Sequence, residues 1–277
     1  MRTWPALDLD ARTHVTLDDL DERLALFLDD HDVIALEHES SAHWRVYFAD
    51  DQARQRVCDS LPDALPDTFD VGPVDVEDEG WALKVQQTLG AVEVGRVVIA
   101  PPWDVPASTP HQVIVIEPSM GFGTGHHQST RLCLRILQDV DVTGLDVIDA
   151  GTGSGVLAIA ACLRGAAHAR ALDYDEDAIA GAVENARRNA VGDRVEAAVA
   201  DLGTWSGAPA PLVFANLTAF LLRRFMATVH AMVAPGGRLI LSGFTTDQVP
   251  LVLDAFPGWT MVSRMDEDDW VGLLLKR

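Results

Sequence analysis

The feature that most constrains the fold is a strand–turn–helix unit at residues 146–163. Residues 146–149 form a predicted buried strand that ends in Asp149, and the run Ala-Gly-Thr-Gly-Ser-Gly at 150–155 follows it. Residues 154–163 are almost wholly apolar, as expected of a helix packed against a sheet. Glycines permit a tight turn and the close approach of a ligand to the backbone. The unit predicts an α/β sheet with a ligand site at the carboxyl ends of its strands.

Strands and helices alternate throughout the C-terminal part of the chain. The predicted strands are 146–149, 169–172, 195–199, 212–216 and 238–242, and the predicted helices are 128–138, 154–163, 175–189, 220–233 and 246–256. Repeated βα units predict a doubly wound, mostly parallel sheet that is covered on both faces. The last two strands, 260–264 and 270–275, are too close together for a crossover helix, so we expect an antiparallel hairpin at one edge.

Residues 1–78 are predicted to form a separate, small α+β domain for substrate recognition. Strands are expected at 3–9, 33–38, 44–48 and 68–76, with helices at 17–28 and 53–61. The order βαββαβ is that of a ferredoxin-like unit. Residues 79–112 are predicted to be a connector, with a helix at 81–89 and a strand at 97–100. The catalytic domain is then expected at 113–277, and 277 residues suit two domains.

The net charge of −21 limits the classes of partner. A chain this acidic is not expected to bind nucleic acid through its phosphates, whereas it can attract a basic protein. The favoured interpretation is a solvated acidic surface suited to a salty cytoplasm, and a basic substrate fits either interpretation. No apolar run approaches the ~20 residues of a membrane span, and the N-terminus does not resemble a signal peptide. We therefore expect a cytoplasmic protein, and the dispersed Cys58, Cys133 and Cys162 predict no metal site.

Two ligand classes compete for the glycine-rich turn. A dinucleotide-binding turn would read GxGxxG, but this one reads GxGxG, and no basic residue near it could bind a pyrophosphate. Asp173, at the end of the next strand, can bind the ribose hydroxyls of either ligand, and Asp201 follows the third strand, where it can accept from an adenine amine. The series favours S-adenosylmethionine over NAD. The predicted cofactor contacts here are Asp149, Gly151, Thr152, Gly153, Asp173 and Asp201. That these residues only form turns and helix caps is the open alternative.

A second glycine-rich run, EPSMGFGTGHHQST at 117–130, precedes a predicted helix. Such a composition indicates a loop of special backbone geometry. Its candidate cofactor-binding residues are Phe122, Gly123, Thr124 and Ser129. The ring of Phe122 is expected against the adenosine or the methyl sulfonium, which also makes Phe122 a catalytic candidate. His126 and His127 either take up a proton or cap the helix.

Asn216 ends the fourth predicted strand, within Phe-Ala-Asn-Leu at 214–217. In such sheets this position faces the transferred methyl group. An amide oxygen there can accept a hydrogen bond from an amine and orient its lone pair, so Asn216 is a catalytic candidate. Asn216 and Leu217 are also candidate cofactor contacts. Alternatively, Asn216 is only a turn residue at the end of the strand.

Together these motifs resemble the PrmA family, the bacterial methyltransferases of ribosomal protein L11. The resemblance rests on 117–134, the turn 149–155, Ala-Asn-Leu at 215–217 and Leu-Ser-Gly at 241–243 with Gln248, and it covers residues 113–277. Gly80, Val85, Gly121 and Ser129 depart from the family pattern. The resemblance implies a class I, Rossmann-like methyltransferase that uses S-adenosylmethionine to methylate lysine side chains and the N-terminal amine of L11, a basic protein.

Three alternatives to that activity follow from the sequence. A methyltransferase of the same fold could act on another protein or on a small amine. A non-enzymatic S-adenosylmethionine-binding module is disfavoured by Asn216 and the complete loop at 121–130, and an RNA methyltransferase is disfavoured by the net charge.

Overall fold

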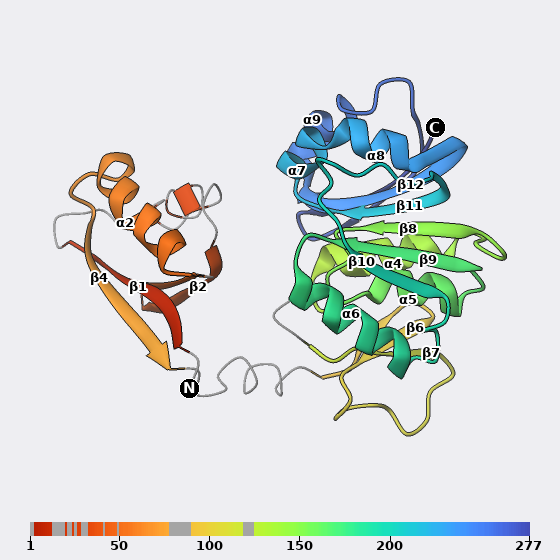
Figure 1. Cartoon of the computed structure of the whole chain (residues 1–277), viewed down its shortest axis with the longest axis horizontal. Helices are drawn as coiled ribbons and strands as arrows, with labels where there is room; N and C mark the ends of the chain where they lie inside the picture. The colour runs from red at the N-terminus through yellow and green to blue at the C-terminus, as the bar shows by residue number, and fades with distance from the viewer. Residues whose placement is uncertain are drawn as a thin grey trace. The chain divides into compact units, whose positions relative to one another are not determined.

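The computed structural model describes residues 3–12, 20, 24, 27–28, 33–40, 42–48, 50–77, 90–118 and 125–277. Two units divide the chain, Met1–Lys84 and Val85–Arg277 (Figure 1). The predicted helix at 81–89, most of the predicted helix at 17–28, and the candidate residues Phe122, Gly123 and Thr124 lie outside the described residues.

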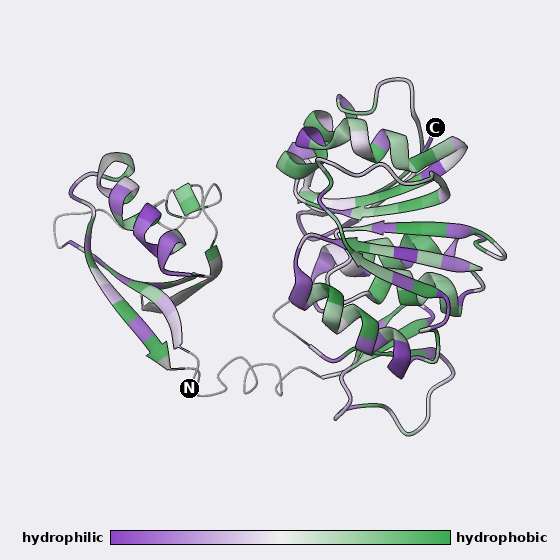
Figure 2. Cartoon of the chain, in the orientation of Figure 1, coloured by the Kyte–Doolittle hydropathy of each residue, from purple (hydrophilic) through white to green (hydrophobic). Residues whose placement is uncertain are grey.

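The N-terminal unit contains an antiparallel sheet of four strands in the order β2-β3-β1-β4. The strands are β1 Thr3–Ala11, β2 Val33–Ser40, β3 His43–Phe48 and β4 Phe69–Glu77. Helix α2, Asp51–Ala64, packs on the sheet through Ala53, Val57 and Leu61, which recur every four residues and so share one face. The outward side of α2 is largely hydrophilic (Figure 2). The predicted strands and this helix are confirmed, with ends shifted by one to three residues.

The C-terminal unit is built on a sheet of seven strands in the order β10-β9-β8-β11-β12-β14-β13. The strands are β8 Asp146–Ala150, β9 His168–Asp173, β10 Val195–Val199, β11 Ala210–Asn216, β12 Val233–Thr245, β13 Thr260–Glu267 and β14 Trp270–Lys276. The pairs among β8 to β12 are parallel, and β14 runs antiparallel to both of its neighbours. The doubly wound, mostly parallel sheet and its closing hairpin are confirmed, with β13 at the edge.

Helices cover both faces of this sheet (Figure 1). The helices α4 Gln128–Gln138, α5 Val156–Leu163 and α6 Glu176–Arg188 contribute to one hydrophobic core, and α7 Ala219–Arg224, α8 Met226–Met232 and α9 Val249–Leu253 contribute to the other. Neighbouring strand residues point to opposite faces. Val147 accordingly packs in the first core and Ile148 in the second, and Leu212 and Val213 divide in the same way.

Two helices that the sequence predicts as continuous are interrupted. The predicted helix 220–233 is α7 and α8, which meet at Phe225. The predicted helix 246–256 is the 3₁₀ turn η1, Thr246–Gln248, followed by the short α9. Pro250 lies in the first turn of α9, where its missing N–H and fixed φ favour a helix start over a helix interior. Nothing in the sequence marks the break at Phe225.

Part of the predicted connector 79–112 belongs to the C-terminal unit. A sheet of three strands, β5 Val92–Val94, β6 Val97–Ala100 and β7 Gln112–Val115, packs beside α4 and α5. The amide of Gln138, at the end of α4, accepts from Arg96 N at 2.7 Å and donates to the carbonyl of Val94 at 2.8 Å. From Val92 onward these residues are therefore structural parts of the unit and not free linker. None of the helices in the described part of the chain is long and apolar enough to span a membrane.

Candidate active site

The site lies where the strand order of the seven-stranded sheet reverses. Strand β8 has β9 on one side and β11 on the other, so the chain winds away from β8 in both directions. In open α/β sheets, this switch point leaves a crevice beyond the carboxyl ends of the strands. Asp149 is near the end of β8, Asp173 ends β9 and Asn216 ends β11, while Asp201 follows β10 by two residues. The fold thus brings the predicted polar residues to one edge.

The backbone N–H groups of the glycine-rich turn donate hydrogen bonds to other atoms of the protein. Gly151 and Thr152 both donate to the carbonyl of Leu172, at 2.8 and 2.9 Å, and Gly155 donates to the carbonyl of Thr152 at 3.0 Å. Gly153 donates to Oδ2 of Asp173 at 2.9 Å. A phosphate-binding loop instead points several N–H groups at the ligand. The geometry therefore agrees with the preference for a ligand without phosphates.

A side chain at Gly151 would strain the backbone and displace the side chain of Leu217. Its φ is +73°, in the left-handed region that favours glycine. A Cβ there would lie 2.5 Å from Cδ2 of Leu217, the residue after β11. The backbone N–H of Leu217 is itself held by the carbonyl of Ser242 at 3.0 Å. The turn after β8 and the first residue after β11 are consequently in contact, as expected of two candidate cofactor-binding segments.

Asp149 is fully buried beneath the turn. Its Oδ2 accepts from Oγ1 of Thr152 at 2.6 Å and from the N–H of Ala158 at 3.2 Å. Its Oδ1 has no hydrogen-bond partner among the described residues. Burial disfavours the charged form and raises the pKa of Asp149 to about 6. Oδ1 is therefore a buried acceptor whose hydrogen-bonding capacity is not used by any described residue.

Asp173 and Asp201 differ in how the structure holds them. Asp173 is half-buried and accepts from Gly153 N through Oδ2 and from Asp175 N, at 3.2 Å, through Oδ1. Asp201 is exposed and accepts from Gly203 N at 2.7 Å. Asp173 is therefore tied to the glycine turn, whereas Asp201 shares the edge but has no described bond to the other candidates.

The amide of Asn216 is oriented by Thr130 of α4. Nδ2 of Asn216 lies 3.4 Å from Oγ1 of Thr130, a fully buried residue, and Oδ1 of Asn216 is enclosed without a hydrogen bond to any described residue. A buried acceptor without a partner is costly, and such atoms are frequent where a ligand binds. Thr130 lies in the glycine-rich run but was not among the predicted site residues, because sequence spacing does not show that α4 reaches β11.

His127 acts as the N-cap of α4. Its Nδ1 lies 3.2 Å from Ser129 N and 2.7 Å from Ser129 Oγ, and its ring meets Trp270 edge-on at 4.4 Å. Burial lowers the pKa of His127. His126 contacts the carbonyl of Gly90 through Nε2 at 3.0 Å. The sequence left two roles open for His127, proton uptake and helix capping, and in this structure His127 caps the helix. Ser129, which His127 contacts, belongs to the same cap.

The comparisons with known proteins agree with this geometry. The family described as Ribosomal protein L11 methyltransferase (PrmA) matches residues 7–277. The chain belongs to this family. The predicted resemblance to the PrmA family is thereby confirmed, and with it the assignment to the S-adenosylmethionine-dependent methyltransferases.

Individual members of the PrmA family show the extent of the similarity. The chain is 37% identical over 199 residues to the ribosomal protein L11 methyltransferase of Shewanella amazonensis, covering 70% of this chain and 66% of the relative. It is 40% identical over 205 residues to that of Geobacter metallireducens, covering 72% of this chain and 67% of the relative. The matched segments thus span about two thirds of these relatives.

A solved structure gives the same result for the fold. The crystal structure of the ribosomal protein L11 methylase from Lactobacillus delbrueckii subsp. bulgaricus superposes with a TM-score of 0.63 at 27% identity, covering 68% of this chain and 99% of that one.

The described residues fit the methyl donor of the PrmA family. The unfilled Oδ1 of Asp149, the side-chain-free turn at Gly151 and the carboxylate of Asp173 lie together at the carboxyl edge of the sheet. They offer acceptors for an amino group and for hydroxyls, and no cradle for phosphate. Among the described residues no cluster of three or more His, Cys, Asp or Glu side chains is placed to hold a metal ion.

Proposed function

We propose that this PrmA-family chain transfers methyl groups from S-adenosylmethionine to amino groups of ribosomal protein L11, on lysine side chains and on the N-terminal amine. The observation that carries the proposal is the enclosed, unpartnered Oδ1 of Asn216 at the end of β11, beside the glycine turn that contacts Leu217. An acceptor at this place suits an amine nucleophile. The names of the curated relatives supply the protein substrate.

The reaction needs a neutral amine that is aligned with the donor. S-Adenosylmethionine supplies the electrophilic methyl carbon; as the nitrogen–carbon bond forms, the carbon–sulfur bond breaks and the nitrogen then loses a proton to water. A lysine has a pKa of ~10.4, so its deprotonation near neutral pH costs about 4–5 kcal/mol. Oδ1 of Asn216 would accept an N–H of the amine and direct its lone pair, which makes alignment the main contribution of the residue.

The remaining candidates would hold the donor. Asp173 would accept from ribose hydroxyls, and Asp149 would accept from the amino group of the methionine part through Oδ1. Asp201 would take the adenine amine, and Leu217 would line the pocket beside Gly151. We retain Phe122, with Gly123 and Thr124, as contacts of the donor, although they lie outside the described residues.

We propose that the N-terminal unit recognises the substrate and is ferredoxin-like. The antiparallel order β2-β3-β1-β4, with α2 between β3 and β4 in sequence, is the order expected of that unit. Residues 1–84 hold 21 of the 42 acidic residues but only 7 of the 21 basic ones. This concentration of negative charge would attract a basic ribosomal protein and speed its encounter. Such a substrate also supports a cytoplasmic location.

The decisive experiment is methylation of purified substrate. The full chain is incubated with S-adenosylmethionine and recombinant L11, and the products are mapped by mass spectrometry. We expect methylated lysines, a methylated N-terminus, and no product without the donor. Unmodified L11, with methylation of another protein or of a small amine under the same conditions, would reject this substrate. Ribosomes from cells with and without the gene provide the corresponding test in vivo.

A further inference from the structure

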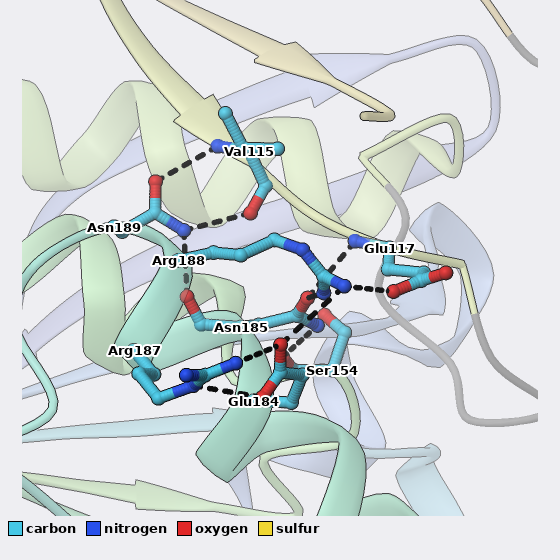
Figure 3. Close-up of polar contacts among 8 residues, drawn as sticks. All are labelled: Val115, Glu117, Ser154, Glu184, Asn185, Arg187, Arg188 and Asn189. Carbon is cyan, nitrogen blue, oxygen red and sulfur yellow. Dashed lines mark hydrogen bonds and ion pairs between the residues drawn. The ribbon is translucent and has the colours of Figure 1, made fainter. Parts of the chain in front are cut away.

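Two asparagines, Asn185 in α6 and Asn189 at its C-cap, bond the chain at 115–117, and Asn185 also bonds the glycine turn (Figure 3). Asn185 accepts from Glu117 N at 2.9 Å through Oδ1 and donates to the carbonyl of Ser154 at 3.0 Å through Nδ2. Asn189, one turn later at the C-cap of α6, accepts from Val115 N at 2.8 Å and donates to the Val115 carbonyl at 2.7 Å. Figure 3 shows both amides directed from α6 towards the chain at 115–117.

The two amides take the place of a neighbouring strand. β7 pairs with β6 on one side, where Ala100 is the partner of Val115 and its carbonyl accepts from Ile116 N. The N–H and carbonyl of Val115 and the N–H of Glu117 have no strand partner on the other side among the described residues, and Asn185 and Asn189 supply these backbone groups with hydrogen-bond partners. Asn185 and Asn189 are four residues apart, so they lie on one face of the helix and can satisfy them.

Asn185 differs from Asn189 in what it joins. Both contact the chain at 115–117, but Asn185 also bonds Ser154, which lies between Gly153 and Gly155 in the turn. Asn189 instead completes its bonds within α6, by donating to the carbonyl of Asn185 at 2.8 Å. Asn185 is only 1% exposed, so water cannot easily replace either of its bonds.

The ion pairs around the amides are weaker candidates for this connection. Arg188 pairs with Glu117 and, at 3.4 Å, with Glu184, and Arg187 pairs with Glu184 at 3.0 Å. These side chains are partly or largely exposed, and ion pairs in contact with water contribute little. The buried amide of Asn185 is therefore the better-placed connection between the two segments.

We propose that Asn185 is a positioning residue for the methyl donor, which it serves by fixing the glycine turn; this rests on the function proposed above. Gly153 and Gly155 both have positive φ, and glycine backbones restrict the turn little by themselves. Asp173 holds the turn at Gly153 from β9, and Asn185 holds it at Ser154 from α6. The bonds of Gly151 and Thr152 to Leu172 hold the start of the turn, so loss of the Asn185 bond would release its later part, where Gly153 and the carboxylate of Asp173 would shift relative to the ribose.

The test compares Asn185→Asp with the matched variant Asn189→Asp. Each change keeps an acceptor for the N–H of Glu117 or Val115 and removes the bonds that Nδ2 donates, which are one for Asn185 and two for Asn189, but only Asn185→Asp loses the bond to the turn. We expect Asn185→Asp to weaken S-adenosylmethionine binding, measured by calorimetry, by roughly 10- to 100-fold and to raise the KM for the donor, with kcat at saturation changed less than about threefold. Asn189→Asp should lower the melting temperature to a similar degree but change the dissociation constant less than about threefold.

Arg187→Ala serves as a second control, because Arg187 is largely exposed and pairs with Glu184, and it should leave donor affinity within about twofold of wild type. Should Asn185→Asp fail to fold, Asn185→Ser, whose side chain is too short to span both partners, takes its place with the same expectation. Equal loss of donor affinity in the Asn185 and Asn189 variants, or wild-type affinity in the Asn185 variant, would overturn the proposal. These readouts use the donor alone, so failure to methylate L11 would reject the proposed substrate and leave this result standing.

Discussion

The backbone N–H of Gly153 donates to Oδ2 of Asp173 at 2.9 Å, so the acid that ends β9 holds the turn that follows β8. We predict that this one carboxylate has two tasks: it fixes the backbone around the candidate cofactor site, and it accepts hydrogen bonds from the ligand at the carboxyl edge of the sheet. Substitutions at Asp173 should separate these tasks.

We expect Asp173→Ala to weaken S-adenosylmethionine binding by ~1.5–3 kcal/mol, as for the loss of charge-assisted hydrogen bonds. Asp173→Asn retains an oxygen for Gly153 N but removes the charge, and its loss should be smaller. Calorimetry on both variants, with thermal melts to establish folding, measures this difference. Unchanged affinity in Asp173→Ala would place the ribose contact elsewhere.

A second prediction concerns Leu217, the residue after β11, which lies very close to Gly243 in β12. Gly243 has a φ of +96°, and a Cβ there would lie 2.5 Å from the carbonyl oxygen of Leu217. Gly243→Ala should therefore lower the free energy of unfolding by at least about 3 kcal/mol, from backbone strain and a backbone clash together. Gly144 has a φ of +72° with no atom within 4 Å of the added carbon, so Gly144→Ala should cost only about 1–2 kcal/mol of strain. Denaturant titrations would contradict the argument if the two variants were equally stable.

The buried carboxyl of Asp149 predicts a pH dependence of stability. Burial raises its pKa in the folded protein to about 6 from an unfolded value of 3.8. The folded state thus binds the proton of Asp149 more tightly than the unfolded state does. Proton binding therefore stabilises the folded state fully below about pH 4, and this contribution is lost as the pH rises through about 6. The free energy of unfolding of cofactor-free wild type, relative to Asp149→Asn, should fall by about 2–3 kcal/mol between roughly pH 4 and pH 7.

Denaturation of both proteins across that range tests the prediction. Asp146→Asn, at the exposed start of β8, controls for removing an acid from the same strand. A constant difference between wild type and Asp149→Asn would show that Asp149 does not titrate there.

The architecture of the C-terminal unit could be predicted because its apolar residues follow the periods of strands and helices. Alternating apolar strands and helices of ordinary length allow few topologies once connections are right-handed, and the polar residues that end the strands must then share an edge. The sheet of β5, β6 and β7 was not predicted as a whole. The apolar run 97–100 suggested a strand, but its pairing with Gln112–Val115 spans a proline-rich segment and leaves no local pattern.

Hydrogen bonds between segments far apart in the sequence could not be predicted, for a physical reason. The carbonyl of Leu172 accepts from Gly151 and Thr152, and Thr130 reaches Asn216, only because tertiary packing brings separate segments together. The sequence does indicate that Asn185 is unusual. It lies on the apolar face of α6, three residues after Ala182 and next to Ala186, where a polar side chain needs a buried partner. The sequence does not show which partner it has.

The extent of the C-terminal unit leads to a prediction for truncated chains. A chain of residues 85–277 should fold and bind S-adenosylmethionine but fail to methylate intact L11, because the candidate donor contacts all lie after residue 116 and the acidic unit is missing. A chain of residues 96–277 should be less stable, because it loses the buried Val94 and the carbonyl that accepts from Gln138. Thermal melts, calorimetry and methylation assays on both chains test these points, and full activity of residues 85–277 on intact L11 would remove the N-terminal unit from substrate recognition.

The final prediction separates donor binding from methyl transfer. Oδ1 of Asn216 is enclosed and unpartnered among the described residues, while Nδ2 is directed at Thr130. If Oδ1 accepts from the amine, its contact is with the nucleophile more than with the donor. Asn216→Ala should lower the single-turnover rate by ~10- to 1,000-fold, equivalent to about 1.4–4 kcal/mol of transition-state stabilisation, with donor affinity changed less than about tenfold.

Two further variants are compared with Asn216→Ala. Thr130→Val removes the hydroxyl that orients the amide but keeps Oδ1, so it should slow transfer less than Asn216→Ala does. Phe122→Ala, if the ring covers the donor, should weaken donor binding as well as the rate. Dissociation constants and single-turnover rates for the three variants distinguish these roles, and a wild-type transfer rate in Asn216→Ala would show that Asn216 is only a turn residue at the end of β11.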